Sequence, residues 1–318
     1  MRCATSPCWP GRLACPSMRS EWPYQLLPDD AYADEVVMRL EAAYHEADQA
    51  SLAAQRTYRR ILAGLAAAST VVALAFLLYD ATDSFVGLAL VGLTLALEWA
   101  LSRRATRLGC HRTFLEQRVL AEALRVQVML RYAGSGLCVG DLLTWTQLEE
   151  TGWLRGRIEG LVGEAMPAQA HDVRDVWVED QRAYHARAAQ RSAPDVARSE
   201  HIVGAALWCS VALYATLIVF ELTAGEGAGA DAWRTGLKAL LGGVSAATVF
   251  IANYYDKASL TRVHADHVKM ERFYAWVLGR MDEEGQTEEL LERLAREELI
   301  ENGNWYSYQL EGTPDISV

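Results

Sequence analysis

The sequence predicts an all-α membrane protein with four helical spans, built from two transmembrane hairpins whose long cytoplasmic helices form a helical bundle. Three observations support this prediction. Four apolar segments are long enough to cross a bilayer, they occur in two pairs, and the rest of the 318 residues is strongly charged. We find no alternation of apolar and polar residues that would indicate a β-strand of any length.

The first pair of predicted spans covers residues 61–79 and 85–101. The first segment has no ionisable side chain except its terminal tyrosine, and its helix would measure about 28 Å, close to the roughly 30 Å thickness of the hydrocarbon core. The second segment is at the short limit for a span and contains one acid, Glu98. Both segments are apolar on all sides, whereas a soluble core helix usually keeps one polar face.

The second pair of predicted spans covers residues 202–222 and 237–255, with a Gly-rich acidic connector between them. The tripeptide "AYH" occurs at 43–45 and 183–185 and precedes the first span of each pair by a similar distance. A repeat period of roughly 140 residues indicates a duplicated two-span unit. We therefore expect a first unit over 28–165, a second unit over 166–310, a disordered tail or over-extended start over 1–27, and a short tail over 311–318.

Basic residues near the span ends predict the orientation of the chain, because they are retained on the cytoplasmic side of a membrane. Both ends of the first hairpin are rich in arginine, while its turn carries only acids. The second hairpin shows a weaker bias in the same direction. We expect a multi-pass protein of the inner, cytoplasmic membrane with both termini in the cytoplasm. The basic residues are Arg56, Arg59, Arg60, Arg103, Arg104, Arg107, Arg191, Arg198, Lys257 and Arg262.

Charge and motifs exclude several classes of function. A net charge of -11 without a clustered basic face argues against nucleic-acid binding. Cys3, Cys8 and Cys15 do not have the paired spacing of a zinc site, and His264 and His267 of "HADH" are expected to be surface histidines of a helix. The sequence contains no phosphate-binding loop, nucleophile elbow or metalloprotease motif. We expect no enzymatic activity, no cofactor and no metal.

Polar side chains inside the predicted spans are the candidate functional residues. Thr94 and Glu98 share one face of the second span, and Ser245 and Thr248 form a polar stripe on the fourth. Burying a carboxylate in lipid is costly, so an intramembrane glutamate is a functional candidate, and we predict that these four residues line a pore. Alternatively, Glu98 is an interfacial anchor, since Arg103 follows it closely.

Small residues predict a face for close helix packing on the fourth span, formed by Gly242, Gly243, Ala246 and Ala247. Outside the spans, the helix after residue 105 carries an apolar stripe at heptad-like spacing, with Glu122 as its polar exception. We expect this stripe to pack against a partner helix. Its members are Leu115, Val119, Val126 and Met129.

Three cytoplasmic segments carry a resemblance to a known family. They are "RVLAEALRVQ" at 118–127, "WVEDQRAYHARAA" at 177–189 and "AREELIENGNWYSY" at 295–308. They look like segments of the SLATT family, the SMODS- and SLOG-associating two-transmembrane effector domains, with two such units in tandem. The resemblance implies a pore-forming effector of bacterial conflict systems that responds to nucleotide signals. This chain contains no sensor of its own, so a nucleotide sensor or synthase would have to act in trans.

Three functions from different classes follow from these observations. A pore gated through the cytoplasmic helices comes first, and it requires a homo-oligomer because four spans are too few to enclose a wide channel. A non-conducting membrane scaffold or adaptor that oligomerises through the same helices is the alternative. A small transporter is the third, although such proteins use helices broken by Gly or Pro at the midplane, and no predicted span contains proline.

Overall fold

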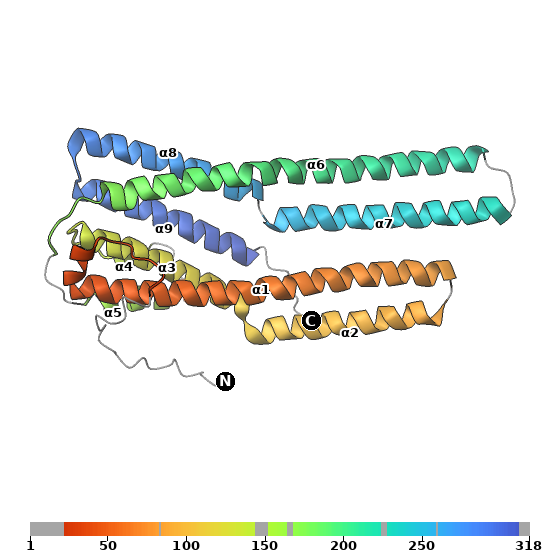
Figure 1. The fold of residues 1–318 in the computed structure, drawn as a ribbon, viewed down its shortest axis with the longest axis horizontal. Coiled ribbons are helices and arrows are strands. Elements are labelled where there is room, and N and C mark those ends of the chain that lie inside the picture. Colours follow the sequence, from red (N-terminus) through yellow and green to blue (C-terminus); the bar gives the residue numbers. More distant parts are fainter. Residues whose placement is uncertain are drawn as a thin grey trace. The chain divides into compact units, whose positions relative to one another are not determined.

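The computed structural model describes residues 22–82, 84–143, 152–163, 168–223, 228–258 and 260–311 (Figure 1). These residues form helices and connecting turns, and no β-strand occurs among them. The predicted all-α class is therefore confirmed. The tail over 1–21, with Cys3, Cys8 and Cys15, and the tail after residue 311 lie outside the described residues.

The helices follow one another along the chain with short connections. They are the 3-10 helix η2 (Asp29–Ala33), α1 (Glu35–Thr82), α2 (Phe85–Leu108), α3 (Cys110–Tyr132), α4 (Val139–Leu142), α5 (Gly152–Val162), the π-helix η4 (Arg174–Glu179), α6 (Asp180–Thr223), α7 (Ala228–Ala258), α8 (Leu260–Glu284) and α9 (Glu288–Glu311).

Capping groups set several of the helix ends. At the start of α1, the Asp34 carboxylate accepts a hydrogen bond from the amide of Val36 at 2.8 Å. The Ser84 hydroxyl accepts one from the amide of Val86 at the start of α2. The helix α2 ends at Gly109, whose φ of 54° lies in the left-handed region that glycine adopts without strain. This glycine separates the second predicted span from the α3 helix that follows it.

The chain divides into two compact units. Unit 1 holds the described residues of 1–53, 113–180 and 274–311, and unit 2 holds those of 54–112 and 181–273. The tandem division at residue 165 stays a prediction, and both compact units draw on both halves of the sequence. The reason is that single helices such as α1 have one part that packs in each unit.

Unit 1 is organised around a buried apolar core. Leu40, Leu124, Ile158, Trp177 and Leu294 have no solvent-exposed surface. The predicted stripe on α3 is confirmed as buried, with at most 3% of each residue exposed at Leu115, Val119, Val126 and Met129. Residues 22–27, which the sequence placed in the tail, also pack here: Leu27 is buried and the amide of Leu26 donates to Glu41.

Unit 2 consists of helical hairpins with apolar outer surfaces. The helix α2 runs back along α1, and α7 runs back along α6 (Figure 1). Large apolar side chains are exposed on these helices, among them Phe85 at 79%, Trp208 at 72% and Leu222 at 81%. A surface of this kind suits lipid rather than water.

Three helical stretches of the described chain are long and apolar enough to cross a membrane: Glu35–Phe76, Phe85–Tyr132 and Arg174–Thr223. The first contains residues 61–76 of the span predicted over 61–79, and the other two contain the predicted spans 85–101 and 202–222. The fourth predicted span lies in α7, where the side chains of 249–258 are outside the described part of the structure. That span stays a prediction.

Candidate functional site

The polar site in the first hairpin pairs Glu98 of α2 with Ser69 of α1. The Ser69 hydroxyl donates a hydrogen bond of 2.6 Å to Oε1 of Glu98. Ser69 lies eight residues after Ile61, where the predicted span begins, which is about 12 Å along the helix axis. Arg103 was expected to draw Glu98 to the interface. Its guanidinium lies instead over the ring of Trp99, with 5.1 Å between its Cζ atom and the ring centroid. The carboxylate of Glu98 therefore contacts the neighbouring helix at the depth of the first span.

Thr94 lies one turn before Glu98 and is 8% exposed. Its hydroxyl donates to backbone carbonyl groups of its own helix, those of Leu90 at 2.7 Å and Val91 at 3.1 Å. Such bonds satisfy a hydroxyl inside an apolar environment without a partner from another helix. The structure thus places both predicted residues of the second span toward the interior of the hairpin.

In the second hairpin, the predicted residue Thr248 approaches Ser210 of α6. Their hydroxyl oxygens are 3.5 Å apart, and each hydroxyl also bonds a carbonyl group of its own helix. Ser245 is half-buried on the same helix, α7. Each hairpin thus has a hydroxyl-containing contact between its two helices, while a carboxylate is present in the first hairpin at Glu98.

The predicted small-residue packing face on α7 receives little support from the geometry. A Cβ atom added at Gly242 would meet no atom within 4 Å, and Ala247 is exposed. Gly243 is half-buried, and the side chain of Ala246 lies outside the described residues. In the first hairpin, the helices approach closely at Gly87 of α2, where an added Cβ would lie 3.0 Å from backbone atoms of Tyr79 in α1.

Charged residues connect α6 and α7 near the turn of the second hairpin. The guanidinium of Arg234 donates to Glu221 at 3.0 Å and to Asp231 at 2.9 Å, and the Lys238 ammonium is 3.6 Å from Glu221. Trp233 is exposed beside them. Tryptophan and paired charges are typical of a membrane–water interface, so this cluster marks one boundary of the apolar surface.

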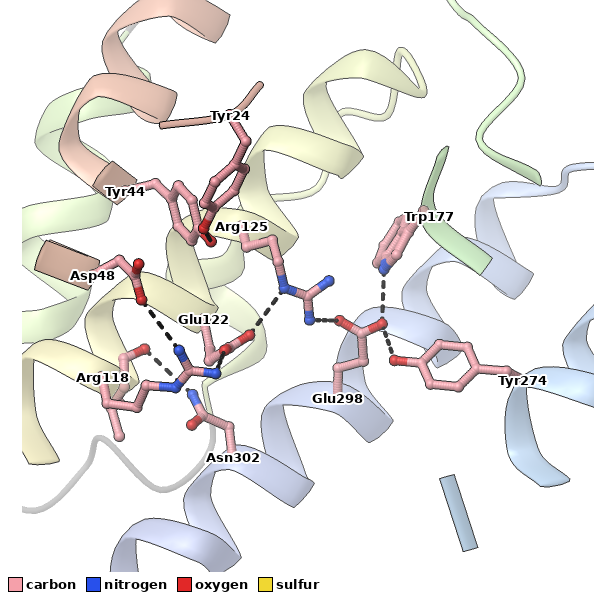
Figure 2. A network of polar contacts seen from close by, with 11 residues as sticks. Tyr24, Tyr44, Asp48, Arg118, Glu122, Arg125, Trp177, Tyr274, Glu298 and Asn302 are labelled. Carbon is pink, nitrogen blue, oxygen red and sulfur yellow. Dashed lines mark hydrogen bonds and ion pairs between the residues drawn. The ribbon is translucent and has the colours of Figure 1, made fainter. Parts of the chain in front are cut away.

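A buried polar cluster lies in the core of unit 1 and is centred on Glu298 of α9 (Figure 2). Its carboxylate accepts hydrogen bonds from the indole of Trp177 at 2.7 Å, the phenol of Tyr274 at 2.5 Å and the guanidinium of Arg125 at 2.9 Å. Arg125 also donates to Glu122 at 2.9 Å. We call these five residues the Glu298 cluster. It joins α3, η4, α8 and α9 through one carboxylate.

The electrostatics of the Glu298 cluster favour its charged form. Burial alone would lower the pKa of Arg125, but Glu298 and Glu122 outweigh burial and raise it well above its usual value. Burial and then the adjacent Glu298 carboxylate raise the pKa of Tyr274. The tyrosine therefore stays protonated and donates, while the arginine stays charged. A buried ion pair satisfied in this way is costly to break from one side.

A second polar group lies on the same helices, closer to the surface. Arg118 contacts Asp48 of α1 at 3.2 Å and also pairs with Glu122, and the amide of Asn302 donates to the carbonyl of Val119 at 3.3 Å (Figure 2). The three segments that carry the family resemblance thus meet in unit 1. Segment 118–127 supplies both arginines, 177–189 supplies Trp177, and 295–308 supplies Glu298 and Asn302.

Sequence reasoning did not identify Glu298 or its partners as a cluster. A signal was nevertheless present, because Glu298 continues the buried face of α9 that Leu291, Leu294 and Ala295 begin. A carboxylate buried on an apolar helical face needs a hydrogen-bond donor that is buried with it. The identity of that donor could not be read, since Arg125 is far away in the sequence.

The histidines of "HADH" lie half-buried on α8 and contact residues of α6. His267 contacts His185 of α6 with 3.0 Å between the two Nδ1 atoms, and His264 contacts the hydroxyl of Ser192 at 2.9 Å. His185 is buried and the other two are half-buried. Packing of α8 against α6 brings these groups together, which the spacing within one helix could not reveal.

Among the residues that the structure describes, no group of three or more His, Cys, Asp and Glu side chains could hold a metal ion. Comparison with known proteins finds no matching family model, no matching curated protein and no matching solved structure. The functional argument therefore rests on the geometry of this chain.

Proposed function

We propose that this chain is a four-span, multi-pass protein of the bacterial inner membrane whose homo-oligomer forms a pore. The exposed apolar surfaces of α1, α2 and α6 support the membrane location, because three helical stretches are long and apolar enough to span a bilayer. α7 runs back along α6 and supplies the fourth span of the proposal (Figure 1). The basic residues beside the hairpins support termini in the cytoplasm.

The observation that carries the pore proposal is the contact between Ser69 and Glu98. A carboxylate inside an apolar span is expensive, and such residues usually mark an ion or proton path. Ser69 is exposed and Glu98 is half-buried, so in the proposal this polar contact meets the neighbouring copy of the oligomer. In an oligomer, one Glu98 from each copy would form a ring of charges of the kind that selects cations.

Gating in this proposal passes through helices that contribute to both units. α1 has its first part in unit 1 and its remaining part in unit 2, and α8 extends likewise from unit 2 into unit 1. Neither helix contains a proline. A change in the polar contacts of unit 1 would therefore act on the same rigid helices that lead into the spans.

The SLATT-like segments suggest what the trigger would be. They supply four of the five residues of the Glu298 cluster, all except Tyr274, so the resemblance falls on a part of the chain with many contacts in unit 1. We propose that a nucleotide sensor or synthase acts in trans on unit 1, in a bacterial conflict or antiphage system. The proposal involves no enzymatic activity and no cofactor of this chain.

A non-conducting scaffold is the second candidate, and one observation favours it. Thr94 bonds carbonyl groups of its own helix, and Glu98 bonds Ser69 of the same hairpin. Polar groups satisfied within a hairpin need no water path. In a scaffold, the same oligomer would form through unit 1 and the spans would serve as anchors.

Ion flux from liposomes that contain the purified protein separates these candidates. The pore proposal predicts flux that rises with protein density, with crosslinked oligomers in the same membranes. Protein-free liposomes and liposomes with denatured protein provide the controls. Oligomers without flux, under every trigger tried, would support the scaffold, and monomers alone would exclude the pore.

Topology is tested separately with reporters that are active only in the cytoplasm. Fusion after Val318, or within 134–140, is expected to give signal, and fusion after Thr82 is expected to give none. Signal from the Thr82 fusion would reverse the proposed orientation.

A further inference from the structure

The contact between His185 of α6 and His267 of α8 has properties that the pore proposal does not use. The two Nδ1 atoms face each other at 3.0 Å, and the rings are 5.1 Å apart between centroids. A hydrogen bond between two ring nitrogens requires one nitrogen with a proton and one without. The contact thus depends directly on the number of protons that the pair holds.

We propose that the His185–His267 contact is a proton-operated latch that holds α8 against α6 near neutral pH and releases it on acidification. With at most one proton on the facing nitrogens, one ring donates and the other accepts. Once both Nδ1 atoms carry protons and both rings are charged, two donors and two like charges face each other at hydrogen-bond distance. The contact then becomes repulsive.

The surroundings of the pair oppose the second protonation. His185 is 6% exposed and His267 is half-buried. Burial lowers the pKa of His267, the nearby Asp266 acts in the opposite direction, and His264 and Arg191 lower it further. The charged form of His267 is therefore disfavoured while α8 is in place.

Other groups on both helices complete the environment of the latch. The ring of Tyr184 lies edge-on to both histidines, at 5.1 Å from His185 and 6.0 Å from His267. One turn away, Arg182 of α6 pairs with Glu271 of α8 at 3.3 Å. In the other direction, Ser192 contacts His264 at 2.9 Å. The histidine groups are the members of this set that change charge near neutral pH.

The direction of the pH dependence follows from proton linkage. The closed latch holds fewer protons than two separated histidines, so acidification favours the open form. Uptake of one extra proton on opening shifts the equilibrium by about tenfold per pH unit. The shift is expected below the ordinary histidine pKa of about 6.5 and is absent above it. This latch is independent of whether the spans conduct ions.

Hydrogen–deuterium exchange of the full-length protein in lipid nanodiscs tests the latch. Backbone amides of 182–192 and 264–271 are compared at about pH 7.5 and about pH 5.5, after correction for the intrinsic pH dependence of exchange. The wild type is expected to lose protection in both segments at the lower pH, by at least about tenfold.

Two variants and a control separate the latch from general acid destabilisation. His267→Gln keeps a hydrogen-bonding side chain that does not titrate, and it is expected to remove the pH response of both segments. His185→Gln provides a second route to the same result if the first variant folds poorly. The control is His171→Gln, which alters a histidine that stacks on Tyr132 in unit 1 and should leave the response intact. A pH-independent wild type, or a pH response preserved in both latch variants, would overturn the proposal.

Discussion

Polar side chains are accommodated in opposite ways in unit 1 and unit 2. In unit 1, apolar side chains fill the interior and a full ionic cluster is buried with them, so that Glu298 finds three donors. In the hairpins of unit 2, large apolar side chains face outward, and the polar side chains at Ser69, Thr94 and Glu98 form bonds within a hairpin. A folded region surrounded by water can bury a charged group at a cost in free energy. In lipid, by contrast, each polar group must find a hydrogen-bond partner within the protein nearby.

The two units also differ in how directly a residue couples distant parts of the sequence. Glu298 connects segments that lie far apart along the chain, and its loss affects several helices together. The contact of Ser69 and Glu98 joins consecutive helices of one hairpin. Mutations in unit 1 are therefore expected to change the stability of the fold, and mutations at the polar sites of unit 2 to change function at nearly constant stability.

The largest expected effect is that of Glu298→Ala. The substitution leaves the guanidinium of Arg125 and two further donors without their acceptor, and breaking a buried ion pair from one side costs about 3–5 kcal/mol. Thermal or denaturant unfolding of the purified protein, followed by circular dichroism, measures this loss. Glu289→Gln changes an exposed acid of the same helix and serves as the control. Equal stability of both variants would show that the Glu298 cluster does not hold unit 1 together.

A smaller effect is expected for Gly87→Ala in the first hairpin. The new Cβ would lie 3.0 Å from backbone atoms of Tyr79, so α1 and α2 must move apart by a few tenths of an ångström, at a cost of about 1–3 kcal/mol. Gly92→Ala on the same helix meets no atom within 4 Å and is the matched control. The comparison is made by thermal unfolding in detergent. A Gly87→Ala variant as stable as the control would mean that the two helices do not approach this closely.

Sequence reasoning succeeded where the pattern alone decides burial. The apolar stripe of Leu115, Val119, Val126 and Met129 was predicted to pack, and the structure buries all of it. Sequence reasoning could not identify contacts between distant segments, because periodicity identifies a buried face and not the partner of that face. The pairs of Glu298 with Arg125 and of His185 with His267 are of this second kind.

The packing face predicted at Gly242, Gly243, Ala246 and Ala247 stays a prediction. Small residues permit close approach of helices but do not cause it, and Gly242 has no neighbour within 4 Å of an added Cβ. Gly87 does lie close to a neighbouring helix, because an added Cβ there would be 3.0 Å from backbone atoms of Tyr79.

A pH titration tests the burial of Tyr44 in unit 1. Burial and the hydrogen bond to Tyr24 raise the pKa of Tyr44 in unit 1, so the folded protein keeps this proton while the unfolded chain releases it above pH of about 10. Stability is thus present below that pH and falls as the pH rises further, by up to about 1.4 kcal/mol per pH unit.

Tyr44→Phe is expected to reduce this loss at alkaline pH, measured as the slope of the unfolding free energy against pH. An unchanged slope in Tyr44→Phe would mean that the tyrosine ionises as easily in the folded protein as in the unfolded chain.

The smallest effect on stability and the largest on function are expected together at Glu98. Glu98→Gln keeps the volume and can still accept from Ser69, so the free energy of unfolding should change by no more than about 0.5 kcal/mol. The amide removes the charge that would select cations in a narrow path. Thr94→Val tests the same face of α2, and Thr216→Val is its control, because Thr216 also bonds its own helix but is exposed.

The most direct measurement is the reversal potential of liposome-reconstituted protein under a cation gradient, for the wild type, Glu98→Gln, Thr94→Val and Thr216→Val at matched membrane levels. A pore lined by Glu98 predicts cation preference in the wild type and in Thr216→Val, and loss of that preference in Glu98→Gln and Thr94→Val. Currents with the same selectivity in all four proteins would remove Glu98 from the conduction path, and the absence of current from all four would contradict the pore itself.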